Sequence, residues 1–485
     1  MTDHYGKKLL FLLFVTIGFY LQNFLLVPIL SRNLGIETYG IWTQILVAIN
    51  FLVPLCALAL PQAFTRFSAG ETEKAEIARN YYTVLFVILI TGLLVSFLFF
   101  CFSGFISRSF IKTEAAILPL LHVASLLILL QALSQYTVNY FRTFQREKAF
   151  SFFQLLQSLC TIAFAFILVR TGYGLLQIIF ALILIHMFIF TVAQYLIVRT
   201  IGWKQPDFKR LRPFLLFCLP LLPLSILNWV INVSDRYVIG FFLPVTEVGT
   251  YSACYMPSMV IMFFYAPFYV ILMPKLVELW ERNDDYTLKK VLTYSNKIPL
   301  LACIPTVLGY AVLYAPILKL LTGEAISVPV LLIPLICIGY IFFYIGGFYS
   351  SVFSLVKRTK YTTAGYAIGA IANIAGNICL VPVIGIIGAA ITTMLTFLIQ
   401  MLYFMQKSKK FYDINLNWDY LWKCILASVL LYLLLIALKQ PLSYYGDSFL
   451  VIASILIGAC VYLVILYLLG VYKKEEIELI RDLIR

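Results

Sequence analysis

Long uncharged, apolar runs divide this chain at nearly regular intervals. About 20 apolar residues, each rising ~1.5 Å, cross the ~30 Å hydrocarbon core of a membrane. The first such run extends from Leu9 to Leu30, and the last from Ser448 to Tyr472. One unbroken run from Tyr361 to Gln406 is too long for a single helix, and Pro382 and Gly385 near its middle predict two helices joined by a tight turn. The pattern predicts an all-α, polytopic membrane protein of about 14 transmembrane helices.

Composition supports this interpretation and excludes several classes of protein. Of the 485 residues, 62% are hydrophobic and only 12% are charged, which leaves too few charges to cover a soluble globule. The net charge of +14 comes from Lys and Arg scattered between apolar runs, so we expect no nucleic-acid partner. The ten Cys stand apart, without a CxxC motif or a Cys/His cluster, and no connection is long enough to hold a soluble domain. We therefore expect no disulfide framework, metal site, cofactor or enzymatic activity.

The distribution of basic residues predicts the orientation of the chain. With fourteen crossings, the two termini and the loops on their side of the membrane hold 29 of the 36 Lys and Arg, whereas the opposite side holds 6. Basic residues concentrate in short cytoplasmic loops. We therefore expect a multi-pass protein of the cell inner (cytoplasmic) membrane with both termini cytoplasmic. The first apolar run is too long for a typical signal peptide and has no cleavage site after it, so we expect it to remain in the mature protein.

The two halves of the chain carry an internal repeat. Three pairs of residues lie at nearly constant offsets: Gly40 with Gly249 at 209 residues, and Pro61 with Pro274 and Gly172 with Gly385 at 213. Each copy holds an even number of helices, so both enter the membrane in the same direction. We predict two pseudo-symmetric six-helix lobes, residues 1–200 and 201–410, followed by two more helices and a short cytoplasmic tail in 411–485. Such repeats are typical of transporters that alternate access to a central site, although a duplicated bundle without transport remains an alternative.

A polar stripe marks the seventh run, which extends from Pro213 to Thr246. Its members are Ser225, Asn228, Asn232, Asp235 and Arg236, whose spacing places them on one face of a helix. Charged side chains are costly in lipid, so those present should face a wet cavity or a partner. The stripe therefore either lines a substrate cleft or joins helices by hydrogen bonds. Pro220 and Pro223 precede it and favour a kink or hinge.

Other candidate residues stand nearer the ends of predicted helices. Arg32 lies on the outer side, which has few basic residues, and Arg66 with Gln62 lies at the inner end of the second helix. Each Arg is either a headgroup or gate residue, or an anchor at the membrane surface. His122 and His186 lie inside apolar runs and either relay protons or hydrogen-bond between helices.

A ridge of small residues in the eleventh predicted helix favours close helix packing. The ridge consists of Gly365, Gly369 and Gly376 with Asn373 and Asn377.

Four strings give the chain a resemblance to a known family. They are SRNLGIETYGIW (Ser31 to Trp42), PQAFTRFSAG (Pro61 to Gly70), SDRYVIGFFLPVTEVGTYSACY (Ser234 to Tyr255) and NICLVPVIGIIGAAITT (Asn377 to Thr393). The chain resembles the polysaccharide flippases, the O-antigen or repeat-unit transporters of the multidrug, oligosaccharidyl-lipid and polysaccharide exporter superfamily. The resemblance implies an inverted-V bundle whose first, second, seventh and eighth helices face a central cavity.

The resemblance implies that the protein flips a polyprenyl-diphosphate-linked oligosaccharide repeat unit for surface polysaccharide assembly, by alternating access of a cationic cavity. The alternative is an ion-coupled antiporter of small molecules from the same superfamily. Whether a proton or a sodium gradient drives transport stays open. Expected partners are the lipid-linked substrate and membrane lipid, with a polymerase and glycosyltransferases as candidates, and we expect a monomer.

We expect six substrate-binding residues: Arg32, Arg66, Asn228, Asn232, Asp235 and Arg236. The hypothesis is that the three Arg hold the diphosphate or an acidic sugar at successive stages. Asp235 either neutralises an Arg or binds the coupling cation. Because adjacent residues on a helix do not face each other, we expect its partner on another helix, with Arg32 the leading choice.

Overall fold

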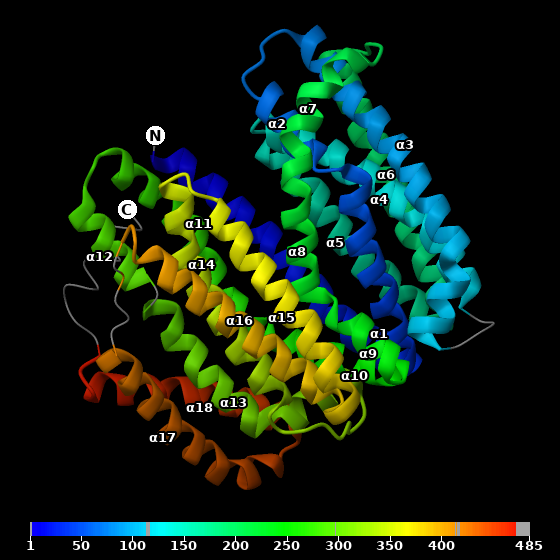
Figure 1. The fold of residues 1–485 in the computed structure, drawn as a ribbon. Helices are drawn as coiled ribbons and strands as arrows, with labels where there is room; N and C mark the ends of the chain where they lie inside the picture. The colour runs from blue at the N-terminus through cyan, green and yellow to red at the C-terminus, as the bar shows by residue number, and fades with distance from the viewer. Residues whose placement is uncertain (1, 113–116, 296, 413, 415–417, 472–485) are drawn as a thin grey trace. The chain divides into compact units, whose positions relative to one another are not determined.

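The computed structural model describes residues 2–112, 117–295, 297–412, 414 and 418–471. Within these ranges the chain forms helices and no strand. It divides into two compact units, Met1–Gly249 and Thr250–Arg485, each of which is a bundle of long helices (Figure 1). The predicted all-α, polytopic fold is therefore confirmed.

The first unit is built around a long helical hairpin. Its elements are α1 (Thr2–Ala57), α2 (Leu60–Ser68), α3 (Lys74–Ile106), η1 (Ser107–Ile111), α4 (Leu118–Thr143), α5 (Glu147–Arg170), α6 (Leu175–Ile201), η2 (Phe208–Arg210), α7 (Leu211–Cys218), η3 (Leu219–Leu221), α8 (Leu222–Val233) and α9 (Asp235–Phe242). Helix α1 packs against α5, α4 and α3, and α4 packs against α6. The segments α7 to α9 form the seventh predicted helix and contact α1 and α2, so they belong to this unit.

The chain enters the second unit through α10 (Val245–Ser258). The elements that follow are α11 (Val260–Glu281), α12 (Asp285–Ser295), α13 (Lys297–Thr322), α14 (Leu332–Leu355), α15 (Lys360–Ile384), α16 (Ile386–Ser408), α17 (Trp418–Ser443) and α18 (Asp447–Leu468). Helix α16 packs against α14 and α15, while α17 and α18 pack against α13 and against each other.

The helix count agrees with the prediction. Twelve helices among the described residues are long and apolar enough to cross a membrane. The first of them, Tyr20–Ala57, contains a turn at Gly35, whose φ of 84° lies in the left-handed region, so it comprises two crossings. The eighth predicted crossing corresponds to α10 and α11 together. Fourteen membrane crossings therefore account for the described helices.

The internal repeat is visible in the packing. In the first unit α4 and α5 both contact α6, and in the second unit α14 and α15 contact α16 in the same way. Gly172, before α6, and Gly385, before α16, both adopt positive φ, at 85° and 68°. Glycine tolerates this conformation, and here it allows two helices to reverse direction in a tight turn. The two pseudo-symmetric halves are confirmed, while the lobe boundaries at residues 200 and 410 stay a prediction.

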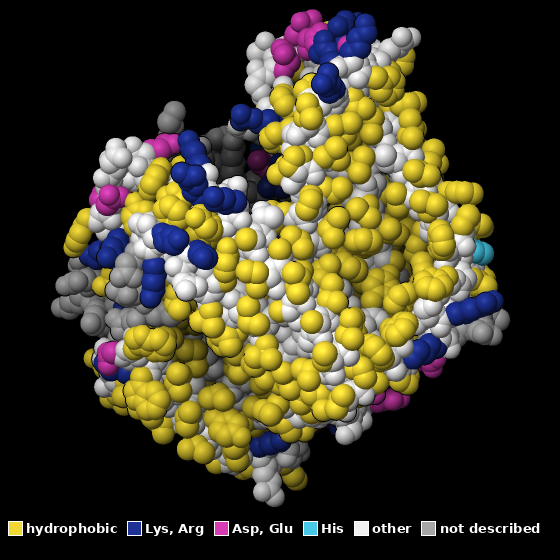
Figure 2. All heavy atoms as spheres, in the orientation of Figure 1, with side chains coloured by type: hydrophobic (Ala, Val, Ile, Leu, Met, Phe, Trp, Pro, Cys, Tyr) yellow, Lys and Arg dark blue, Asp and Glu magenta, His cyan; other side chains and the backbone are white. Residues whose placement is uncertain are grey.

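The surface of the bundle is suited to lipid. Large apolar side chains such as Phe97, Phe105, Leu184 and Phe188 are exposed along α3 and α6. Figure 2 shows hydrophobic side chains covering the flanks of the helices, with charged side chains gathered at helix ends. A monomeric soluble protein rarely exposes so much contiguous apolar surface.

The glycine ridge of α15 is buried and serves close packing. A Cβ added at Gly376 would lie 2.7 Å from Thr392 Cγ2 of α16. Asn373 and Asn377 are fully buried, and the Asn377 amide donates a hydrogen bond to Asn373 Oδ1 at 3.0 Å. These contacts support the packing interpretation of this ridge.

Candidate functional site

The seventh helix is interrupted at Pro220 and Pro223. The α-helix of α7 ends at Cys218, and the 3₁₀ turn η3 contains Pro220, while Pro223 lies at the start of α8. Proline lacks the backbone N–H that an uninterrupted helix requires. Ser234, between α8 and α9, keeps helical φ and ψ of −65° and −21°. The predicted proline kink is confirmed, and it leaves α8 as a short segment that carries the polar stripe.

Asn228 and Asn232 form the exposed part of that stripe. Asn228 is exposed and Asn232 is partly exposed, one helical turn further along α8. The Asn232 side-chain amide donates to the backbone O of Asn228 at 2.9 Å and to its Oδ1 at 3.1 Å. Ser225, one turn before Asn228, is also exposed. This part of the stripe faces outward from the helix bundle, as a binding surface requires.

Asp235 and Arg236 form a buried ion pair. Their exposed fractions are 1% and 5%, and Arg236 Nη1 donates to Asp235 Oδ1 at 2.7 Å. The same carboxylate oxygen accepts the Arg236 backbone N–H at 2.9 Å. The expectation that these neighbours would not meet is wrong. The long Arg236 side chain folds back onto the Asp235 carboxylate and onto the Asn232 backbone O at 2.9 Å.

A glutamine of the second crossing holds this segment in place. Gln44 Nε2 donates to the backbone O of Arg236 at 2.8 Å, and Gln44 is 2% exposed. Gly240 provides the space, because a Cβ there would collide with Gln44 Nε2 and with the backbone O of Phe110. Sequence reasoning missed Gln44, whose only signal is a polar side chain within an uncharged run.

The two glycines of the repeat, Gly40 and Gly249, meet at a reciprocal helix crossing. A Cβ on Gly40 would collide with the Val245 carbonyl O, and a Cβ on Gly249 would collide with the Ile36 carbonyl O. The same two Cβ atoms would lie 3.0 and 3.1 Å from the backbone N of the opposite glycine. Gly40 corresponds to Gly249, and Ile36 to Val245, at the same offset of 209 residues. Equivalent backbone segments of the repeat therefore pack on each other about a local two-fold axis.

Arg66 lies on α2, beyond a break in the second crossing. Leu58 and Ala59 adopt left-handed φ of 48° and 56°, which separates α1 from α2. Arg66 and Gln62 are both exposed. The helix that carries them is fixed by Phe67, whose ring stacks on Phe214 of α7 at 5.0 Å.

Arg32 lies three residues before the turn at Gly35 and is exposed. The two exposed arginines therefore lie near opposite ends of the second crossing. Arg236, in contrast, is buried in its ion pair, so the three predicted cations do not share one kind of environment.

A network of charged side chains joins α3 to the connection that precedes α7. Arg210 forms ion pairs with Glu76 of α3 and with Asp207, whose Oδ2 lies 3.1 Å from Arg210 Nε. The backbone N–H of Asp207 donates to Thr83 Oγ1 at 2.8 Å. The hydrogen bond from Arg210 lowers the pKa of Asp207 below its ordinary value of 3.8. This network ties the connection before α7 to α3.

The two intramembrane histidines have different surroundings. His186 is 2% exposed, and its Nδ1 lies 2.8 Å from Ser134 Oγ on α4. His122 stacks on Phe100, with ring centroids 4.2 Å apart. For His186 the contact fits a hydrogen bond between helices. No group of three or more His, Cys, Asp or Glu that would suit a metal ion occurs in the part of the chain that the structure describes.

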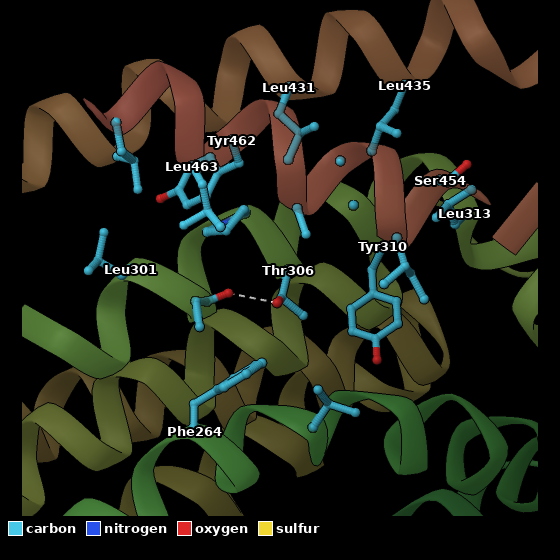
Figure 3. Close-up of a pocket in the computed structure, with 18 of the residues that line it drawn as sticks. Phe264, Leu301, Thr306, Tyr310, Leu313, Leu431, Leu435, Ser454, Tyr462 and Leu463 are labelled. Carbon is cyan, nitrogen blue, oxygen red and sulfur yellow. Dashed lines mark hydrogen bonds between the residues drawn. The ribbon is translucent and has the colours of Figure 1, made fainter. Parts of the chain in front are cut away.

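The second unit contains an apolar pocket of about 510 Å³ between α11, α13, α17 and α18. Leu301, Leu431 and Leu463 are among its lining residues (Figure 3). Two of its polar side chains turn to backbone partners: Thr306 Oγ1 donates to Ala302 O and Tyr310 OH to Pro257 O, both at 2.7 Å. The pocket therefore suits hydrocarbon better than a polar headgroup.

The duplicated bundle and the polar face within its membrane span define a polytopic helical membrane protein with a transporter-type architecture. Within this class, the chain belongs to the family described as polysaccharide biosynthesis protein, which matches residues 5–280. The family predicted from the four strings is thereby confirmed.

Two curated relatives resemble part of the chain. One is a probable low-salt glycan biosynthesis flippase, Agl15, of Haloferax volcanii, which is 21% identical over 316 residues. The other is an uncharacterized membrane protein of Methanocaldococcus jannaschii, 29% identical over 203 residues. The matched regions cover 63% and 39% of this chain, and the chain spans 65% and 38% of these relatives' own lengths.

Solved structures of similar fold are transporters. The lipid II flippase MurJ, in an inward closed conformation, aligns with a TM-score of 0.73 and 19% identity over 97% of this chain and 100% of its own. An inward-facing multidrug resistance transporter of the MATE family aligns with a TM-score of 0.68 and 14% identity, over 81% of this chain and 94% of its own. At these identities the similarity establishes the fold alone.

Proposed function

We propose that this protein flips a polyprenyl-diphosphate-linked oligosaccharide across the cytoplasmic membrane for the assembly of a surface polysaccharide. The observation that carries the proposal is the exposed polar stripe of α8 inside a membrane-spanning helix. A polar amide left without a partner in hydrocarbon costs about 2–7 kcal/mol, so such side chains are expected to face water or substrate. The family and the name of the haloarchaeal relative support the same function.

The charges of such a substrate are its phosphates, and exposed arginines suit them. The guanidinium group binds phosphate oxygens through two parallel hydrogen bonds. Arg66 and Arg32, near opposite ends of the second crossing, would hold the diphosphate early and late in its passage. Burial of Arg236 against Asp235 gives that residue a structural role in this proposal.

The lipid anchor requires an apolar environment throughout transport. The pocket lined by α11, α13, α17 and α18 offers apolar side chains and few available polar atoms. It is therefore a suitable place for part of a hydrocarbon chain.

An ion-coupled antiporter of small molecules is the second candidate, because the fold also resembles a MATE transporter. Asp235, the acid within the seventh crossing, is already bound to Arg236, which favours the flippase. In this proposal a proton or sodium gradient drives transport, and both termini lie in the cytoplasm.

The test is flipping of a fluorescent polyprenyl-diphosphate oligosaccharide in vesicles that contain the purified protein. Replacing both Arg32 and Arg66 by Gln should abolish flipping, whereas Arg66→Lys should retain part of it if charge contributes without two-point geometry. Arg170→Gln is the matched control, because Arg170 ends α5 and contacts the Phe166 ring. Unchanged flipping by the double variant would remove these arginines from the mechanism. Transport of small cationic drugs without any flipping would favour the antiporter.

A further inference from the structure

The second crossing of the first unit carries a further exposed amide, that of Asn50. Asn50 lies in the second crossing and is exposed, although the residues around it, Val47, Ala48 and Val53, are buried. It follows Gly35 by 15 residues, which places it about 22 Å along the helix from that turn. The hydrocarbon core is ~30 Å thick, so Asn50 lies well inside the membrane span.

Asn50 lies at the level of the polar stripe on α8. Trp229 Nε1 donates to the backbone O of Val47 at 3.3 Å, and the Trp229 ring lies 4.5 Å from the Phe51 ring. These contacts fix the segment around Asn50 beside the segment around Asn228. Asn228 itself precedes Leu243, the end of its crossing, by 15 residues, or about 22 Å. Two neighbouring helices therefore expose amides at the same depth.

A hydrogen bond between the Asn228 and Asn232 side chains determines which of their donors and acceptors remain for a ligand. Asn228 Oδ1 accepts the hydrogen bond from Asn232 Nδ2, at 3.1 Å. This contact leaves the N–H donors of Asn228 and the Oδ1 acceptor of Asn232 available side by side. A phosphate offers acceptors only and has no use for Asn232 Oδ1, whereas a sugar hydroxyl both donates and accepts.

The charged pair that follows Asn232 on this helix does not compete for this role. Arg236, one turn beyond Asn232, is buried and bound to Asp235, and its Nη1 also donates to the Asn232 backbone O at 2.9 Å. The amides of Asn50, Asn228 and Asn232 themselves carry no charge. A neutral polar surface selects against charged ligands, because their desolvation would not be compensated.

We propose that Asn50, Asn228 and Asn232 form a glycan-reading face that binds a neutral, hydroxyl-rich sugar of the lipid-linked substrate, separately from the arginines that bind its diphosphate. This inference rests on the proposed function and adds the substrate class to it. A binding site built on hydrogen bonds rejects ligands that lack the matching groups, so this face determines specificity.

The test uses two probes with the purified full-length protein: a polyprenyl diphosphate that carries a neutral disaccharide, and the same polyprenyl diphosphate without sugar. Binding is followed by thermophoresis in detergent. The unchanged protein should bind the glycosylated probe more tightly. Asn50→Leu and Asn228→Leu, which keep the side-chain size, should each weaken binding of that probe by about 3- to 10-fold and leave the sugar-free probe unaffected. Gln440→Leu, which removes an exposed amide of α17, should change neither affinity.

The outcomes separate this inference from the proposed function. If the unchanged protein binds neither probe, the proposed function fails, and the inference fails with it. If it binds both probes and the Asn variants keep the preference for the sugar, the glycan-reading face is refuted while the flippase proposal stands. If the Asn variants weaken both probes equally, the residues support the site in general and the sugar assignment is refuted. Arg66→Gln should weaken both probes, as a residue that contacts the diphosphate would.

Discussion

Replacing Gly40 by Ala tests the reciprocal glycine crossing. In an ordinary helix this change is favourable by about 1 kcal/mol, because alanine is the better helix former. At Gly40 the new Cβ would collide with the Val245 carbonyl O and lie 3.0 Å from Gly249 N. Both neighbours are backbone atoms, which cannot rotate away as a side chain does. Overpacking of this kind costs about 1–3 kcal/mol, so the net effect should be destabilising.

Gly104→Ala in α3 is the matched control, because a Cβ there meets nothing within 4 Å. We expect Gly40→Ala to be less stable than Gly104→Ala by about 1–3 kcal/mol, the cost of the collision, because the gain in helix propensity applies at both positions. For a unit of this size, each kcal/mol shifts the melting temperature by roughly 2–4 °C. Thermal unfolding of the two variants in the same detergent, followed by size-exclusion chromatography, measures the difference.

The symmetry of the crossing adds a sharper expectation. Gly249→Ala should destabilise the protein about as much as Gly40→Ala, because its Cβ meets the Ile36 carbonyl O in the equivalent way. Once the first alanine has forced the helices apart, the second has more room, so the double variant should lose less than the sum of the two. Equal stability of Gly40→Ala and Gly104→Ala would refute the close crossing itself.

Three further predictions follow from other parts of the structure. Asp235→Asn should lower the free energy of unfolding by about 3–5 kcal/mol, because it leaves a buried cation without its carboxylate. Adding Arg236→Gln should recover part of this loss in the same thermal assay. If the losses of the two single variants simply add in the double variant, the ion pair is contradicted. The lowered pKa of Asp207 means that its ion pair with Arg210 stabilises the protein above the ordinary pKa of 3.8 and is lost as the pH falls below it. The difference in stability between the unchanged protein and Arg210→Ala should therefore be constant from about pH 8 to 5 and shrink below about pH 4. A growing advantage at low pH would reverse the sign of that argument. A Cys introduced at Asn283 should resist a membrane-impermeant thiol reagent in intact cells, since labelling from outside would overturn the proposed orientation.

The helices could be predicted from sequence because the membrane imposes a simple rule. A crossing requires about 20 apolar residues, and that requirement is readable without knowing any contact. The turn at Gly385 could be predicted for a similar reason, since Pro382 and Gly385 interrupt an apolar run that is too long for one helix, and Gly385 adopts the positive φ that glycine tolerates. The break at Leu58 and Ala59 was not readable, because neither residue favours a left-handed conformation and only the surrounding packing can impose it.

The contacts of the candidate site depend on pairs of residues far apart in the chain. Gln44 reaches the backbone of Arg236 across 192 residues, and no local pattern announces that contact. Trp229 likewise reaches Val47 from another crossing. Hydrophobic periodicity specifies which side of a helix is polar, but the partner of each polar group follows from the tertiary packing.

The arginine of the seventh crossing shows that the energetic requirement on an intramembrane charge can be met in more than one way. A charge inside a membrane must be compensated, and the sequence therefore directs attention to Arg236 as a substrate ligand. The structure supplies a partner locally, because Arg236 Nη1 donates to the carboxylate of its neighbour Asp235. What then requires explanation is an exposed, uncharged amide such as Asn50, which has no ion pair to account for its place in the span. An intramembrane charge indicates a partner, whereas an intramembrane amide left on the surface indicates water or a ligand. For the proposed carrier of sugars, the amides are therefore the more informative residues.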